Sequence, residues 1–174
     1  MNLSKKLILV SGTAASGKST FANWLSVKLS VPLVCYDNIK RKVMELGKGD
    51  ISYEMMMLNI EEIMKSSSPL IADYFFVEMQ RAEIEPLVAR YQFKVIQVHL
   101  DADSEITYQR FVERNARDEG EKAIRQADLD IKRFTELTHE SKIFRYDDTA
   151  IHVDTSDFAE VSYDEIVKRI ASLC

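Results

Sequence analysis

A glycine, lysine and hydroxyl motif near the N-terminus carries the clearest chemistry in this sequence. Gly12 is followed by four small residues and then by Gly17, Lys18 and Ser19, which matches the pattern G-x-x-x-x-G-K-[ST]. Glycines at this spacing let backbone N–H groups surround phosphate groups, while the lysine binds the β and γ phosphates and the hydroxyl can bind Mg²⁺. The residues predicted to form this phosphate site are Gly12, Thr13, Ala14, Ala15, Ser16, Gly17, Lys18, Ser19 and Thr20.

Two aspartates follow apolar runs further along the chain. Asp37 comes directly after the run 32–36, and Asp73 lies near the end of the run 70–74. Open parallel sheets bind their ligands at the carboxyl ends of the strands, which is where both carboxylates would lie. Asp37 could orient or deprotonate an attacking hydroxyl, and Asp73 could contact Mg²⁺ or the acceptor. Either carboxylate could instead cap the helix or turn that follows it.

Three arginines recur at helical spacing in the second half of the chain. Arg110, Arg114 and Arg117 are four and three residues apart, so a helix would place them on one face. Arginines can stabilise the charge that develops on a phosphoryl group during transfer, and Arg110 and Arg114 are the main candidates. Because acidic residues such as Glu113 lie among them, an ordinary solvated helix surface is the alternative.

Short apolar runs alternate with longer segments of helical period, which is typical of βαβ units around a parallel sheet. The five predicted strands are residues 6–11, 32–36, 70–74, 94–100 and 150–154. Between and after them, helical periods occupy residues 21–29, 39–46, 55–63, 84–91, 124–134 and 166–173. The sequence therefore predicts a three-layer α/β fold in which helices cover both faces of a five-stranded parallel sheet. We find no linker, so residues 1–174 are predicted to form one domain.

Composition excludes several classes of protein. The chain has 174 residues, of which 46% are hydrophobic, and a net charge of -5. No apolar run approaches the length of a membrane-spanning helix, and the acidic balance disfavours nucleic-acid binding. The apolar segment 7–10 is too short for a signal peptide, so we expect a cytoplasmic protein. Two cysteines and three histidines, none at metal-ligand spacing, predict neither a disulfide framework nor a metal site built from these residues.

The absence of other nucleotide-binding motifs further restricts which class of phosphate-binding protein this can be. The sequence contains no N-K-x-D for guanine and no G-x-G for a dinucleotide. No glutamate follows Asp73 to polarise water, which favours transfer of phosphate to a bound hydroxyl over hydrolysis. A regulatory protein that binds and hydrolyses nucleotide without a small-molecule acceptor remains the alternative.

From Leu7 to Asp154 the sequence resembles the small P-loop kinases, in particular the zeta-toxin-like and chloramphenicol-phosphotransferase-like group of AAA-type kinases, which are akin to nucleotide and gluconate kinases. Beyond the loop, the resemblance rests on three groups of residues. They are Asp37 with Lys40 and Arg41, Asp73 with Arg81, and Arg110 with Arg114 and Arg117. The resemblance implies that the first group contacts the acceptor, that the second assists Mg²⁺ or the acceptor, and that the third belongs to a lid over ATP.

The same resemblance implies the strand order 2-3-1-4-5, an acceptor-side segment at about 38–66 and a small helical lid at about 110–135. The predicted reaction moves the γ-phosphoryl group of ATP to a hydroxyl of a small-molecule acceptor, with Mg²⁺ as cofactor. Lys18, Asp37, Arg110 and Arg114 are its predicted catalytic residues. Ser19 and Asp73 are the predicted Mg²⁺ ligands. The acceptor itself, and the oligomeric state, are left open by the sequence.

Overall fold

A five-stranded parallel sheet organises the computed structural model, which describes residues 3–47, 50–117 and 129–174. The strand order β2-β3-β1-β4-β5 confirms the predicted order 2-3-1-4-5. The strands are β1 (Lys6–Gly12), β2 (Leu33–Cys35), β3 (Leu70–Asp73), β4 (Lys94–Asp101) and β5 (Ile151–Asp154). Each lies within a residue or two of its predicted range, the main difference being that Tyr36 begins a helix and does not end β2.

Strand β1 lies in the middle of the sheet and is buried on both faces. Leu7 and Leu9 belong to one hydrophobic cluster, whereas Ile8 and Val10 belong to a second cluster. Successive side chains of a strand point to opposite faces, so an unbroken apolar run fills two cores at once. This central position fixes the end of β1, where the phosphate motif begins.

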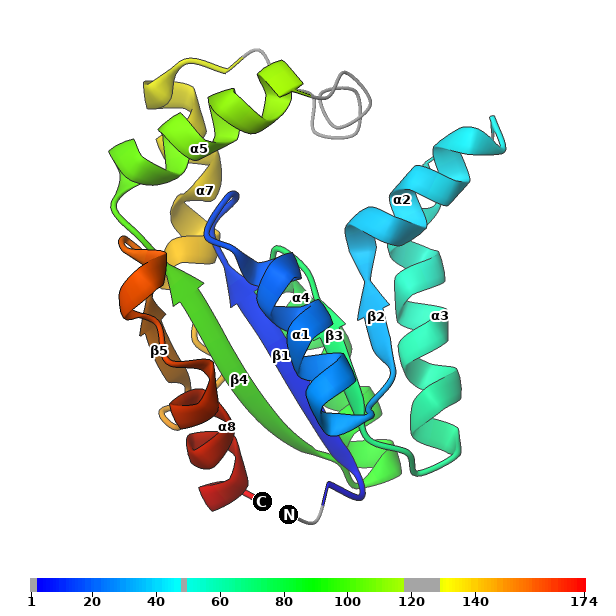
Figure 1. Cartoon of the computed structure of the whole chain (residues 1–174). Coiled ribbons are helices and arrows are strands. Elements are labelled where there is room, and N and C mark those ends of the chain that lie inside the picture. Colours follow the sequence, from blue (N-terminus) through cyan, green and yellow to red (C-terminus); the bar gives the residue numbers. More distant parts are fainter. Residues whose placement is uncertain (1–2, 48–49, 118–128) are drawn as a thin grey trace.

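Helices cover both faces of the sheet and complete the predicted three layers (Figure 1). The second cluster is closed by α1 (Lys18–Leu29) and α8 (Tyr163–Ser172), which lie in front of the sheet in Figure 1. The first cluster is closed by α3 (Ser52–Lys65) and α4 (Glu78–Tyr91). Among the helices that the structure describes, none combines the length and apolarity that a bilayer crossing requires.

Three further helices lie near the carboxyl ends of the strands. They are α2 (Tyr36–Glu45), α5 (Ser104–Arg117) and α7 (Ile131–Ile143), and Figure 1 shows α5 and α7 beyond the ends of β1 and β4. The helix predicted at 124–134 begins at Ile131, because the Asp130 side chain accepts a hydrogen bond from the backbone N–H of Arg133 and caps it. Its earlier part, up to residue 128, lies outside the described residues. A short 3-10 turn, η1 (Phe158–Glu160), follows β5.

Candidate functional site

The phosphate loop connects β1 to α1 and takes a shape that requires glycine at both ends. Gly12 has φ +133°, and a Cβ atom there would lie 1.7 Å from the carbonyl oxygen of Leu100 in β4. Gly17, at φ +88°, is the N-cap of α1. Both angles lie where residues with a side chain are strained. The N-terminal end of α1, which favours anions, is consequently presented at the end of the loop.

Side chains of the loop hold its own backbone. The Lys18 Nζ donates to the carbonyl oxygen of Thr13 at 2.7 Å, and the Ser16 hydroxyl donates to the same oxygen at 2.9 Å. From α7, the buried Ser141 hydroxyl donates to the carbonyl oxygen of Gly12 at 2.8 Å. These bonds bring the lysine ammonium back across the loop, which is the position from which it can reach phosphate.

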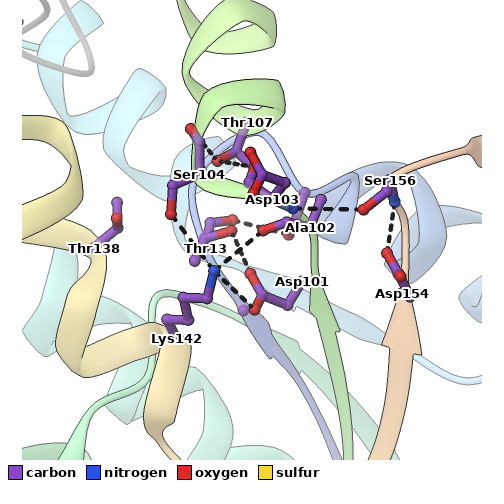
Figure 2. Close-up of polar contacts among 12 residues, drawn as sticks. Thr13, Asp101, Ala102, Asp103, Ser104, Thr107, Thr138, Lys142, Asp154 and Ser156 are labelled. Atoms are coloured by element: carbon purple, nitrogen blue, oxygen red, sulfur yellow. Dashed lines mark hydrogen bonds and ion pairs between the residues drawn. The ribbon is translucent and has the colours of Figure 1, made fainter. Parts of the chain in front are cut away.

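A polar network behind the loop ties it to the helices above the sheet (Figure 2). The Thr13 hydroxyl donates to Asp101 Oδ1 at 3.3 Å, and the Lys142 Nζ lies 3.6 Å from Asp101 Oδ2. Lys142 also donates to the carbonyl oxygen of Ala102 at 3.4 Å and to the Ser104 hydroxyl at 3.5 Å. The carboxylate of Asp101 therefore joins the phosphate loop to the end of α7, and Lys142 extends the connection to the start of α5.

A cavity of about 630 Å³ opens above the loop. Its base is formed by the loop and the start of α1, through Ala14, Ala15, Gly17, Lys18, Ser19 and Thr20. The side next to β2 and β3 is formed by Tyr36, Asp37, Lys40, Asp73, Tyr74 and Phe75. The side next to α5 and α7 is formed by Phe111, Arg114, Leu129, Phe134, Leu137 and Thr138. Nine of the predicted site residues thus line one cavity, while Gly12, Thr13 and Ser16 support the loop and are not among the lining residues.

Asp73 is a buried carboxylate at the base of this cavity. Its side chain is only 3% exposed, and the Cys35 thiol donates to its Oδ2 at 3.4 Å. Burial raises the pKa of Asp73, whereas the charge of Lys18 and a hydrogen bond from Ser19 act in the opposite direction. The contact with Ser19 places the two predicted Mg²⁺ ligands together. A hydroxyl and one carboxylate are a donor set that suits Mg²⁺, which prefers oxygen ligands and completes its shell with water and phosphate.

Asp37 lies in the first turn of α2 and lines the cavity. The N-cap of that helix is Cys35, so the alternative prediction, that Asp37 is the N-cap, is wrong. The helix starts earlier than predicted because Tyr36 already has helical geometry. A carboxylate in the first turn is favoured by the helix dipole.

The three arginines of α5 are directed to different surroundings. Arg114 lines the cavity, as its predicted role requires. Arg110 instead donates to the carbonyl oxygens of Thr155 and Ser156, both at 2.8 Å, and its guanidinium lies 4.0 Å from the ring centre of Phe158. Arg110 is not among the residues that line the cavity, because the segment after β5 supplies it with two backbone acceptors and an aromatic face. The predicted catalytic role of Arg110 therefore finds no support in this arrangement.

Two other arginines named by the resemblance also lie elsewhere. Arg117 is exposed and pairs with Glu113 at 3.2 Å, the arrangement of a solvated helix surface. Arg81 donates to the carbonyl oxygens of Arg145 and Tyr146 and is not among the cavity residues. Arg81 thus joins α4 to the segment after α7.

Aromatic side chains in the cavity were missed by the sequence reasoning. Tyr36 directly precedes Asp37, and Tyr74 and Phe75 directly follow Asp73. The rule that ligands bind at the carboxyl ends of parallel strands could have identified them, since it applies to every residue at that edge. Phe111 and Phe134 also line the cavity, but in the sequence they are ordinary apolar positions of helices, and nothing there distinguishes them from core residues.

Two of the three histidines, buried His99 and exposed His152, lie side by side although they are far apart in the sequence. The parallel register pairs His99 in β4 with His152 in β5, and their ring centres are 5.7 Å apart. Gln97 donates to the Ser11 hydroxyl at 2.6 Å, and the same hydroxyl is hydrogen-bonded to His99 Nδ1 at 3.0 Å. Burial, helped by nearby positive charges, lowers the pKa of His99 to about 3, so the ring is neutral. Within the described ranges, no group of three or more potential metal ligands is found.

The two cysteines are expected to differ sharply in reactivity. Cys35 is buried, and its burial together with the negative charge of Asp73 raises the pKa of the thiol to about 12. Cys174 is exposed. Because the thiolate is the reactive form, a thiol reagent such as dithionitrobenzoate should modify Cys174 alone in the native protein and both cysteines after unfolding. Cys174→Ser is the control and should leave the native protein unreactive; rapid native modification of Cys35 would contradict the assignment.

Comparisons with known proteins agree with this fold. A family model described as AAA domain matches residues 7–137. The chain matches no curated protein. A provisionally assigned kinase of Chloroflexus aurantiacus is 22% identical with a TM-score of 0.83, and the match covers 97% of this chain and 98% of that one.

Two further solved structures share the fold at lower similarity. A gluconokinase of Sinorhizobium meliloti is 15% identical with a TM-score of 0.61, covering 97% of this chain and 90% of that one. A shikimate kinase of Bacteroides thetaiotaomicron is 13% identical with a TM-score of 0.54, covering 97% of each chain. These likenesses show the P-loop fold that the phosphate loop and the strand order already indicate. The family match covers most of the sequence, and the chain therefore belongs to the AAA domain family of P-loop proteins.

Proposed function

We infer that this protein is an ATP-dependent kinase that transfers the γ-phosphoryl group to a hydroxyl of a small molecule. The observation that carries this proposal is that Lys18 and Asp37 line the same cavity from different elements. One is a cation suited to phosphate, and the other is a carboxylate suited to a hydroxyl proton. Kinase relatives of the same fold support the proposal.

Each side chain has a proposed part in the transfer. The loop N–H groups and Lys18 would bind the β and γ phosphates of ATP, and Asp37 would accept the proton of the acceptor hydroxyl as its oxygen bonds to the γ phosphorus. The bond between that phosphorus and the oxygen bridging to the β phosphate breaks, and ADP leaves. Arg114, at the α5 side of the cavity, would offset the negative charge on the transferred group.

Ser19 and Asp73 are the residues that would hold Mg²⁺, since their oxygens lie together beside Lys18. The ion, when bound, neutralises charge on the phosphates. Residues 38–66 would form the acceptor side of the site and residues 110–135 its lid. Residues 118–128 of that proposed lid lie outside the described part of the chain.

Release of ADP tests the proposal. Purified protein with ATP and Mg²⁺ is supplied in turn with nucleosides, sugars, amino-sugar nucleotides and hydroxyl-bearing antibiotics. We expect slow ADP release without acceptor and a large increase with the right one. Asp37→Asn should lower the acceptor-dependent rate by about 10²- to 10⁴-fold while ATP still binds, because the general base is lost. Equally fast release without any acceptor would instead favour a nucleotide-hydrolysing switch.

A further inference from the structure

The acceptor side of the cavity carries a wall of aromatic rings next to Asp37. Cys35 of β2 and Asp73 of β3 are register partners, so the residues that follow them emerge side by side. These residues are Tyr36 and Tyr74, whose ring centres are 4.6 Å apart at an interplanar angle of 60°. Both rings line the cavity, and we call them the tyrosine wall.

Other aromatic side chains pack against the tyrosine wall and support it. The Tyr74 ring lies 5.6 Å from the ring of Tyr53 in α3 and packs edge-on against the buried Phe76 at 5.5 Å. Tyr53 in turn donates to Glu83 Oε2 in α4 at 2.8 Å, which links the two helices beneath. A flat ligand would therefore meet a surface already in place, and binding would cost little side-chain ordering.

The opposite side of the cavity is also suited to flat apolar groups. Phe111 of α5 and Phe134 of α7 line it, and their ring centres are 5.0 Å apart. Leu137 adds a further apolar contact on the same side. The space between α2 and these helices thus has aromatic rings on both sides, beside the polar side chains of Arg114 and Thr138.

Polar groups and aromatic rings share the tyrosine wall side. Among the described residues that line this side, the charged side chains are Asp37, Lys40 and, at the base, Asp73. A polyhydroxylated acceptor loses a hydrogen bond to water for each hydroxyl it buries and needs a protein partner for each. An aromatic ring needs only a face or an edge to pack against, and this wall supplies it.

We propose that the acceptor carries a planar aromatic or nucleobase ring, which packs on the tyrosine wall of Tyr36 and Tyr74 and places a hydroxyl at Asp37. The proposal rests on the kinase function proposed above, but ring binding and phosphoryl transfer can be measured separately. Two chemical sources share this character, a simple aromatic alcohol and a nucleoside. The test therefore includes both.

Ring binding is measured by ligand-observed NMR on the full chain in the presence of Mg²⁺ and a non-hydrolysable ATP analogue. The ligands are matched pairs that differ in ring planarity, namely 2-phenylethanol with 2-cyclohexylethanol, and uridine with 5,6-dihydrouridine. In at least one pair the planar member should bind about three- to tenfold more tightly. Tyr74→Phe keeps the ring and should keep this preference. Tyr74→Leu should abolish it, and Tyr36→Leu serves as the second variant should Tyr74→Leu fail to fold.

Equal binding within both pairs, no binding of any planar member, or a preference that survives both leucine variants would overturn the tyrosine wall as a ring site. Phosphoryl transfer is followed separately as ADP release, with gluconate and ribitol as ring-free acceptors. Transfer to these alone would leave the kinase proposal standing and overturn the ring site. Ring preference without any ADP release would support the ring site and count against the kinase proposal.

Discussion

Replacement of Lys18 by alanine should remove nearly all phosphoryl transfer while leaving the protein folded. The Lys18 ammonium lies over the phosphate loop, where it donates to the carbonyl oxygen of Thr13 at 2.7 Å. Its loss removes the positive charge that the phosphates and the transition state require, and we expect kcat/KM to fall by about 10³-fold or more. The loss also removes a charge that lowers the pKa of Asp73, which further weakens that carboxylate as an Mg²⁺ ligand.

Lys28→Ala is the matched control for this variant. Lys28 lies in the same helix but forms a surface ion pair with Asp164 at 3.2 Å, away from the cavity lining. Such exposed pairs contribute about 0–1 kcal/mol, so activity should be unchanged and unfolding only slightly easier. The measurements are ADP release and nucleotide affinity, with circular dichroism to verify the fold. A Lys18→Ala protein with wild-type turnover would refute the assignment of the site.

Gly12→Ala should be the most destabilising single substitution in the phosphate loop. The added Cβ would lie 1.7 Å from the Leu100 carbonyl oxygen, at a backbone φ of +133°. Neither strand can move away, because β1 and β4 are neighbours inside the sheet and Gly12 is the register partner of Leu100. We expect the free energy of unfolding to fall by more than about 4 kcal/mol, a loss that is exceptional for one methyl group.

Gly47→Ala tests whether this loss comes from the close approach. Gly47 also has a positive φ, +62°, but a Cβ atom there meets nothing within 4 Å among the residues that the structure describes. Only the backbone strain remains, which costs about 1–2 kcal/mol for a residue in the left-handed region. Urea denaturation of both variants separates the two contributions. Similar losses in the two proteins would mean that strand packing at Gly12 is looser than the geometry indicates.

The phosphate loop was predictable because its functional residues are close together in the sequence. Gly12 and Gly17 mark the positive-φ positions, and Lys18 and Ser19 follow at fixed spacing, so short-range rules suffice. Asp37 and Asp73 were predictable for a related reason: both follow apolar runs, and the edge where parallel strands end is where ligands bind. The cavity lining places both carboxylates there.

Features that depend on distant partners were not predictable in this way. From helical spacing, Arg110 and Arg114 were equally good candidates for the cavity. Only the fold shows that the carbonyl groups of Thr155 and Ser156 bind the guanidinium of Arg110. The strand register that joins Tyr36 to Tyr74 likewise follows from β2 and β3 being neighbours. Such contacts depend on which backbone groups the fold brings near, and spacing along the chain carries no signal for them.

The position of β1 has a consequence for the order of folding. The phosphate motif is complete by residue 20, but the loop is shaped by Leu100, which excludes a side chain at Gly12, and by Asp101, which accepts from Thr13 across a separation of 88 residues. Contacts between distant segments form late, because closing the long loop between them costs chain entropy before the contacts can stabilise the fold. During synthesis the motif therefore exists well before the site does. Nucleotide should be able to assist only the last stage of folding, once β4 has joined the sheet.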